Sequence, residues 1–277
     1  STSASPPGWP DIWPAAAASA PRRGEGVPVR FRRAEALILD VQPLGDADRI
    51  VAFLTREAGV LRGVARGARR RYSRHAGQLQ LLSRVDLQWL EKEGRELVRI
   101  TSVETLRAAD ALLASLEGVL AASYLAESVR AFAPEGEPQE LLFRLLDSTV
   151  AALLSGVEPA LATRYFEVWL LRLAGVFPFA SPCPGCGGAL AAGSRLVGGG
   201  ESLVCASCGG EEGEAVAPGA LRFLAAAARS PLGQLAGEGV TEADLAAAER
   251  LAAAVRRHFL QHELRSYEVM MRTLGEV

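Results

Sequence analysis

The chain has almost no lysine. Of its 30 basic residues, 29 are arginine, and Lys92 is the single exception. A phosphate-binding loop of the form G-x-x-x-x-G-K-[ST] needs a lysine, and Lys92 stands between Glu91 and Glu93 in no such loop. The sequence therefore excludes a Walker-type ATPase, and Schiff-base chemistry would have to rest on Lys92 alone. We expect a protein that binds no nucleotide.

Long apolar runs are also missing. No stretch of eighteen or more apolar residues is free of charge, because arginine or glutamate interrupts the Ala/Leu-rich segments. This predicts that no segment spans a membrane. Prolines and Asp11 interrupt the first twenty residues, which lack the charged start and the apolar stretch of a signal peptide. We expect a cytosolic protein.

The net charge of −2 hides a strong asymmetry. Residues 22–107 contain 18 basic and 11 acidic residues, whereas residues 108–277 contain 12 basic and 20 acidic residues. A basic front half favours a polyanionic partner, and chance clustering of charges on solvated faces is the alternative. With 277 residues and 49% hydrophobic residues, the chain can form two or three domains with real cores.

Residues 1–30 are rich in Pro, Ala, Ser and Gly and predict a flexible extension, although Trp9 and Trp13 could dock on the folded body. Residues 31–107 have short, strand-like apolar runs at 36–41, 49–55, 60–64, 85–90 and 96–101, with Pro43 and Gly45 marking the first turn. Five short strands with one irregular segment between the third and the fourth predict a small closed barrel of the OB type.

After residue 107 the apolar spacing becomes helical, over residues 108–180 and again over 214–277. We predict helices from Leu112 to Pro134, at 138–154, 158–175 and 220–228, and at 241–264, where Thr241 and Asp244 resemble a helix cap. The fold class is thus α+β: an N-terminal five-stranded OB-type barrel, then an α-helical bundle that a cysteine-containing segment at 181–213 interrupts.

All four cysteines lie in that segment, as Cys183-x-x-Cys186 and Cys205-x-x-Cys208. A two-residue spacer lets both thiolates of a pair face one ion, and 195–197 and 202–204 can form a hairpin around the Gly198–Gly200 turn. The pattern predicts a zinc ribbon with one structural Zn²⁺, because four sulfur ligands leave no open position for water. Disulfides or a redox C-x-x-C pair are the alternatives.

His258 and His262 stand four residues apart on a predicted helix, a spacing that could hold a metal. Phe259 occupies the position where an H-E-x-x-H motif needs glutamate. We interpret the two histidines as ordinary helix residues. A metal-dependent hydrolase that uses them is a minor alternative.

The segment from Arg62 to His75 has no acidic residue. Its candidate DNA-binding residues are Arg62, Arg66, Arg69, Arg70, Arg71, Tyr72 and Arg74. Guanidinium groups bind phosphates and stack on bases, and an OB barrel presents such residues along a groove beside aromatic platforms. Arg33 and Arg49 are second-rank candidates on neighbouring strands. A solvated loop is the alternative reading, and Tyr72 or Trp89 would dominate if stacking outweighed charge.

The stretch D-A-D-R-I-V-A-F-L-T-R-E-A-G at 46–59, A-R-G-A-R-R at 65–70, Ser73-Arg74 and Leu79-Gln80 resemble the bacterial RecO family of DNA repair proteins. The resemblance covers about 31–277, by its order of barrel, helical bundle and cysteine ribbon. Residues 1–30 lie outside the family pattern, and the basic segment is wholly arginine where the family often includes lysine. Because not all members keep the four cysteines, the zinc prediction rests on the spacing above.

The resemblance implies a non-enzymatic recombination mediator that binds single- and double-stranded DNA and anneals complementary strands. It also implies that RecR is a partner in loading RecA onto single strands covered by SSB, whose C-terminal tail would be a second protein contact. Such a protein would be cytoplasmic and associated with the nucleoid. The rival hypothesis is a zinc-ribbon adaptor that binds only proteins and uses its arginines to dock an acidic partner.

Overall fold

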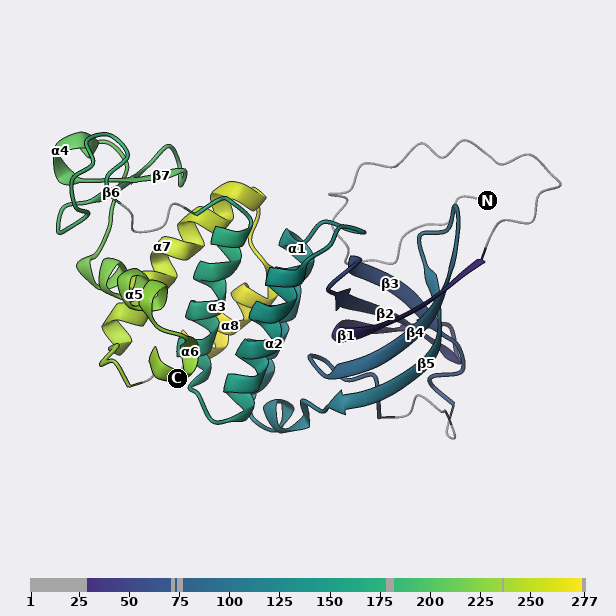
Figure 1. The fold of residues 1–277 in the computed structure, drawn as a ribbon. Helices are drawn as coiled ribbons and strands as arrows, with labels where there is room; N and C mark the ends of the chain where they lie inside the picture. The colour runs from purple at the N-terminus through teal and green to yellow at the C-terminus, as the bar shows by residue number, and fades with distance from the viewer. Residues whose placement is uncertain (1–28, 71–72, 74–76, 178–181, 236, 276–277) are drawn as a thin grey trace.

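The computed structural model describes residues 29–70, 73, 77–177, 182–235 and 237–275. Three parts follow one another along the molecule: a barrel, a group of helices and a small ribbon at the end far from the barrel (Figure 1). The predicted flexible extension falls almost entirely on residues outside the described ones, and its last two residues, Val29 and Arg30, already belong to the first strand. The predicted α+β fold class is confirmed.

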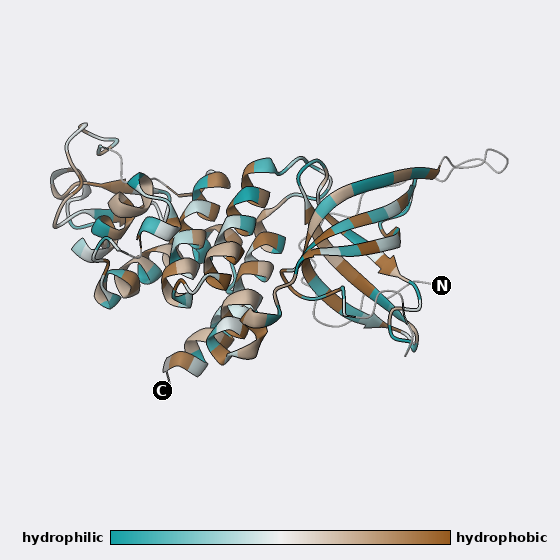
Figure 2. Ribbon diagram, turned by 60° about the horizontal axis from the view of Figure 1, so that its bottom comes forward, coloured by the Kyte–Doolittle hydropathy of each residue, from teal (hydrophilic) through white to brown (hydrophobic). Residues whose placement is uncertain are grey.

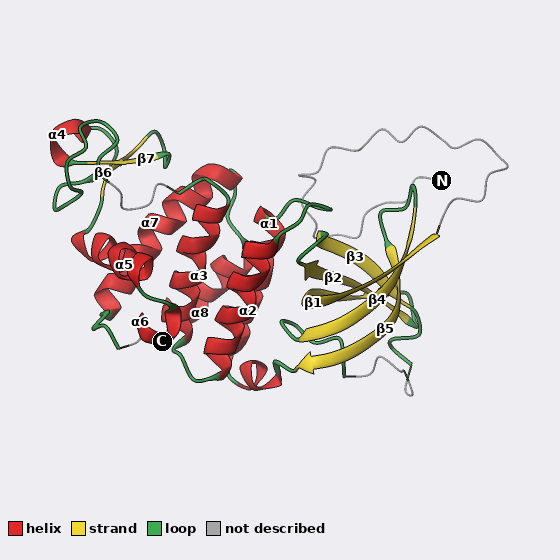
Figure 3. Ribbon diagram, viewed as in Figure 1, coloured by secondary structure: helices red, strands yellow, loops and turns green. Residues whose placement is uncertain are grey.

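The barrel consists of five strands, which are yellow in Figure 3, where the helices are red. They are β1 (Val29–Leu44), β2 (Asp48–Thr55), β3 (Gly59–Ala65), β4 (Arg84–Lys92) and β5 (Val98–Arg107). Their order in the closed sheet is β1-β2-β3-β5-β4, and β3 and β5 are the parallel pair. β1 closes the barrel because its second half pairs with β2 while its first half pairs with β4.

Period-two alternation explains the barrel core, and the alternating colours along the strands follow it in Figure 2. Inward-facing side chains such as Ile38, Phe53, Leu87 and Trp89 form one apolar cluster. The ring of Phe53 meets that of Trp89 edge-on, with centroids 5.6 Å apart. The predicted strands are all present, and β1 is longer at both ends than its apolar run indicated.

The helical part begins with a short 3₁₀ turn, η1 (Asp110–Ala114). It continues with α1 (Leu116–Phe132), α2 (Glu140–Leu154), α3 (Pro159–Leu173), α5 (Pro218–Arg229), α6 (Leu232–Leu235), α7 (Glu242–Leu260) and α8 (Arg265–Gly275). No helix in the described part of the chain is long and apolar enough to cross a membrane.

Two predicted helix limits were wrong. The helix expected from Leu112 begins only at Leu116, because Ser115 caps it by accepting a hydrogen bond from the Gly118 N–H at 3.1 Å. The helix expected to reach Leu264 ends at Leu260, since Gln261 adopts a left-handed conformation with φ of 61°. The segment beyond it forms α8, a helix that the sequence pattern did not predict.

The cap at the start of α7 is confirmed. The Thr241 hydroxyl accepts from the Asp244 N–H at 3.2 Å, and the Asp244 carboxylate accepts from the Thr241 N–H at 3.1 Å. Each side chain thus satisfies a backbone donor that has no partner within the helix. The Asp244 carboxylate accepts from the Thr241 hydroxyl at 2.8 Å as well as from its N–H, and these two hydrogen bonds, together with Arg222, lower the pKa of Asp244.

The barrel and the helices share a core. The outward side chains Leu37, Leu39, Leu54 and Val60 belong to the same apolar cluster as the helices. Around it, Asp147 on α2 accepts from Arg84 at 2.9 Å and lies 2.7 Å from Arg107, so one carboxylate joins α2 to two barrel strands.

Gly59, with φ of +59°, lets the segment after α1 approach the barrel. A Cβ atom there would lie 2.3 Å from the Glu137 carbonyl oxygen. Only a residue without a side chain fits this contact and this backbone conformation together.

A buried ionic network crosses the helical part. Glu167 on α3 is 1% exposed and accepts from Arg164 at 2.5 Å and from the Tyr124 hydroxyl at 2.5 Å. It also accepts from Arg256 on α7, whose guanidinium donates to Glu263 at 2.8 Å. Burial, followed by the charge of Glu167, raises the pKa of Tyr124, so its phenol stays protonated and donates.

We expect Glu167→Ala to lower the free energy of unfolding by about 3–5 kcal/mol, because it leaves buried guanidinium groups without their common carboxylate. Urea denaturation measures the change. The matched control is Arg32→Ala, which removes a surface ion pair with Glu91 and should cost about 1 kcal/mol or less. A similar small cost for both variants would contradict this role for Glu167.

Candidate nucleic-acid interface and metal centre

The arginine-rich segment leaves the barrel at the end of β3 and begins as an anchored turn. The Gly67 N–H donates to the Asp48 carboxylate at 2.8 Å, and the Arg69 N–H donates to the Ala47 carbonyl at 3.0 Å. Ala68 is 7% exposed and packs into the barrel core. The start of the segment is therefore held against the turn between β1 and β2.

Anchoring through the backbone leaves the guanidinium groups outside. Arg66, Arg69 and Arg70 are all exposed, and Arg69 donates to the Gly45 carbonyl at 2.5 Å. Arg49 on β2 stands opposite Ala65, the last residue of β3, so it lies at the same barrel rim. The structure thus brings together four of the predicted DNA-binding residues.

Two other candidates lie elsewhere. Arg62 is half-buried on β3 opposite Ala52, on the side of the barrel that the helices cover. Burial, with a smaller contribution from the charge of Arg62, lowers the pKa of Arg130 on α1. Arg33 forms an ion pair with Asp86 on β4, with 2.5 Å between Nη2 and Oδ2, and this hydrogen bond raises the pKa of Arg33. Neither shares the surface of Arg66, Arg69 and Arg70. Arg71, Tyr72 and Arg74 lie outside the described residues.

Trp89 cannot stack on a base from its place in the structure. Its side chain is 3% exposed, inside the barrel, and its indole N–H donates to Glu91 at 3.1 Å. The alternation of apolar and polar residues along β4 already indicates that Trp89 is buried, because Trp89 shares a face with the buried Val85 and Leu87. Sequence reasoning also passed over Phe31, which stands between arginines on β1 and is 60% exposed.

The cysteine segment forms a small sheet. Its elements are β6 (Arg195–Val197), β7 (Ser202–Val204), the single turn α4 (Ala206–Gly209) and β8 (Glu214–Ala215), and β6 is the middle strand. The predicted hairpin between the two cysteine pairs is present with the expected limits. All four Sγ atoms lie within 4.8 Å of one another, and none is in a disulfide.

The donor set fits one metal ion. Metal–sulfur bonds of ~2.3 Å in a tetrahedron place sulfur atoms about 3.8 Å apart, and Sγ of Cys186 lies 3.6 Å from Sγ of Cys205. The Cys205 N–H donates to Cys183 and lowers the pKa of that thiol to about 6. The Cys208 S–H donates to the other three sulfur atoms, Cys186 first, and this raises the pKa of Cys208 to about 12, so a cation is needed for all four to ionise together.

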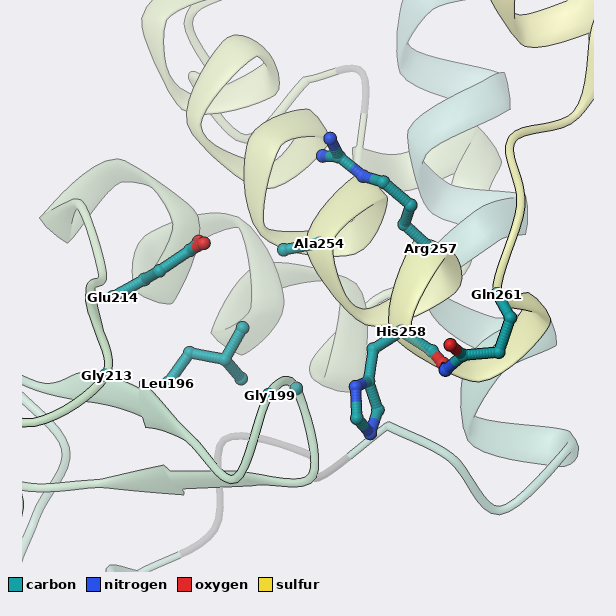
Figure 4. Close-up of a pocket in the computed structure, with 9 residues that line it drawn as sticks. Leu196, Gly199, Gly213, Glu214, Ala254, Arg257, His258 and Gln261 are labelled. Atoms are coloured by element: carbon teal, nitrogen blue, oxygen red, sulfur yellow. The ribbon is translucent and has the colours of Figure 1, made fainter.

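The ribbon rests on the end of α7 beside an open cleft of about 520 Å³ (Figure 4). His258 points toward the glycine turn at Gly199, where a Cβ atom would lie 2.7 Å from its Nδ1. Its partner in the predicted pair, His262, comes after the end of α7, so the two histidines do not share a helix face. Among the described residues, the group of side chains that could hold a metal ion contains the four cysteines and neither histidine.

Two family models match the chain. The model "Recombination protein O N terminal" matches residues 30–109, and "Recombination protein O C terminal" matches residues 113–268. The first covers the barrel and the second covers the helices with the inserted ribbon. Together they span most of the sequence.

Several curated proteins are similar over most of their length, each named "DNA repair protein RecO". One from Anaeromyxobacter sp. (strain Fw109-5) is 33% identical over 246 residues, which is 87% of this chain and 94% of that protein. One from Pelotomaculum thermopropionicum is 32% identical over 88% of this chain and 95% of its own. One from Roseiflexus sp. (strain RS-1) is 33% identical over 86% and 84%, respectively. The chain belongs to the RecO family of DNA repair and recombination proteins.

Proposed function

We propose that this protein is a recombination mediator that binds single- and double-stranded DNA and anneals complementary single strands. With RecR, it helps to load RecA onto single strands covered by SSB, and it contacts the C-terminal tail of SSB. It acts without catalysing a reaction and without a nucleotide, in the cytoplasm at the nucleoid. The observation that carries the proposal is the group of exposed arginines at the rim of the barrel in a RecO-family chain.

The backbone anchoring of this rim supports phosphate binding. Arg66 and Arg70 are exposed and form no ion pair with any described residue, so their charges are available to a polyanion. The carboxylate of Asp48 is already engaged by the Gly67 N–H and faces the loop backbone. Ordering the loop before DNA arrives reduces the entropy lost on binding.

Annealing needs two phosphate backbones to approach each other, and their mutual repulsion opposes this. Guanidinium groups at the rim neutralise phosphates and release condensed counterions, which lowers that repulsion. No covalent bond is made or broken in the process, and base pairing supplies the driving force. Phosphate contacts of this kind carry no sequence information, so complementarity alone selects the partner strand.

The four-cysteine group is proposed to hold one structural Zn²⁺. Cys183, Cys186, Cys205 and Cys208 would occupy all four positions of a tetrahedral site, so the ion would stabilise the ribbon and leave no position for a substrate or water. The three short strands of the ribbon contribute little core of their own, and the ion would supply much of their stability.

We expect the triple variant Arg66→Gln, Arg69→Gln, Arg70→Gln to bind single-stranded DNA more weakly and with a flatter salt dependence. Each lost phosphate contact should reduce the slope of log affinity against log salt by about 0.7 on single strands and about 0.9 on duplex DNA. Fluorescence anisotropy across salt concentrations measures both slopes. The matched control neutralises Arg229, Arg250 and Arg272, three exposed arginines on helices, and should leave the slopes unchanged.

The same two triple variants test the function itself. The variant with Arg66, Arg69 and Arg70 neutralised should anneal complementary strands, and load RecA with RecR, more slowly than the wild type. The control variant with Arg229, Arg250 and Arg272 neutralised should keep the wild-type rates. If the wild type bound RecR but neither bound nor annealed DNA, the protein would be an adaptor and the proposal would be wrong.

We expect Cys183→Ser and Cys205→Ser each to abolish the binding of one zinc ion per chain and to loosen the ribbon, because each removes a ligand of the tetrahedron. Elemental analysis of the purified protein measures the zinc, and limited proteolysis measures the loosening. DNA affinity should change little, since the arginine rim is on the barrel. Wild-type protein with intact disulfides and no zinc would contradict the assignment.

A further inference from the structure

A row of outward-facing side chains runs around the closed barrel, beyond the part of its strands that the helices cover. Strand register places these residues directly opposite one another, in the order Phe31 on β1, Leu90 on β4, Arg99 on β5, Val64 on β3 and Ile50 on β2. Residues that stand opposite in adjacent strands lie on the same face of a sheet. The five side chains therefore form one continuous stripe, called here the outer row.

Burial confirms that the outer row faces away from the barrel interior. Its members are half-buried or exposed, whereas the sequence neighbours Trp89, Ile100 and Val51 are at most 3% exposed inside the barrel. Toward the helices, outward residues of the same strands, such as Leu37 and Val60, are covered by the bundle. The outer row lies beyond this covered part, so its apolar members are open to a partner.

Most of the charged side chains beside the outer row are positive, and the Asp48 carboxylate, two residues before Ile50, accepts from the Gly67 N–H. Lys92, two residues beyond Leu90, is exposed, as is Arg99 within the row. Neither forms an ion pair with any residue that the structure describes. Arg66 follows two residues after Val64, so the row leads toward the arginine rim. The nearby Arg33 is already balanced by Asp86.

Phe31 is the exposed aromatic residue of the described barrel, since Phe53 and Trp89 are both in the core. Its side chain is 60% exposed and stands between Arg30 and Arg32 in the sequence. An exposed phenylalanine near Lys92 and Arg99 suits a ligand that combines flat apolar rings with negative charge. Single-stranded nucleic acid has this combination, with bases that stack on aromatic rings and phosphates that bind cations.

We propose that the outer row is a base-stacking track for one strand of DNA, with Phe31 as its platform and Lys92 and Arg99 as its phosphate contacts. This inference rests on the proposed function and adds a second kind of contact to it. Duplex DNA keeps its bases stacked inside the helix, so Phe31 can stack only on an unpaired base. The outer row thus favours single strands, whereas the arginine rim binds the phosphates of both forms.

The test uses the full-length protein and a labelled dT oligonucleotide in anisotropy titrations. Phe31→Ala should weaken binding at least about fivefold, from the ~1–3 kcal/mol that one stacked base contributes. The salt slope should stay at its wild-type value, because no phosphate contact is lost. Phe31→Trp should retain the affinity and Phe31→Leu should lose it, since leucine is apolar but has no ring. Thermal unfolding checks that the variants fold.

Three comparisons isolate stacking. Phe259→Ala removes an exposed aromatic residue of the helical part, which stacks on Phe132, and should leave dT affinity unchanged. An abasic oligonucleotide and a duplex should bind the wild type and Phe31→Ala equally. Equal dT affinity of these two proteins, or an equal loss on the abasic strand, would overturn the outer row as a stacking track. Failure of the wild type to bind dT at all would instead overturn the proposed function.

Discussion

The arrangement of the molecule depends on the two faces of one long strand. Over Ala36–Leu39, β1 is buried on both sides, with Ala36 and Ile38 in the barrel core and Leu37 and Leu39 in the core shared with the helices. Its first residues, from Val29 to Arg33, pair only with β4 and are exposed. One strand therefore closes the barrel, joins it to the bundle and extends beyond the covered region, which leaves Phe31 in solvent.

The arginines discussed above form two groups, those with a carboxylate partner and those without one among the described residues. Arg84, Arg107 and Arg256 belong to ion pairs that connect separate elements, with the half-buried Asp147 and the buried Glu167 as their partners. At the barrel rim, Arg66 and Arg70 have no such partner among the described residues, and Asp48 is held by a backbone donor. Some arginines therefore join elements of the fold and others present charge at the barrel rim. The position of the nearest acidic residue determines which role an arginine has.

Local patterns predicted much of this structure, and residues whose surroundings come from distant segments were placed less well. The strands, the ribbon hairpin and the Thr241 cap follow from alternation, cysteine spacing and cap chemistry. The place of Arg62 near Arg130 depends on how α1 packs on the barrel, which no local pattern contains. Trp89 is different, because its alternation with Val85 and Leu87 already indicated burial. In the same way, the alternation of polar and apolar residues at Arg30, Phe31 and Arg32, with no turn residue before Ala36, already indicated that the first strand begins before its apolar run.

Annealing sets a limit on how tightly a protein can hold bases. A base stacked on an aromatic ring gains ~1–3 kcal/mol, which is comparable to the ~1.4 kcal/mol per step that it gains on stacking in a duplex. A row of several aromatic residues would therefore compete with base pairing and trap the strand. The outer row offers one exposed ring with aliphatic and cationic neighbours. On the proposed function, such a surface orders a single strand yet releases each base when a complementary strand arrives, while the arginine rim continues to hold the phosphates.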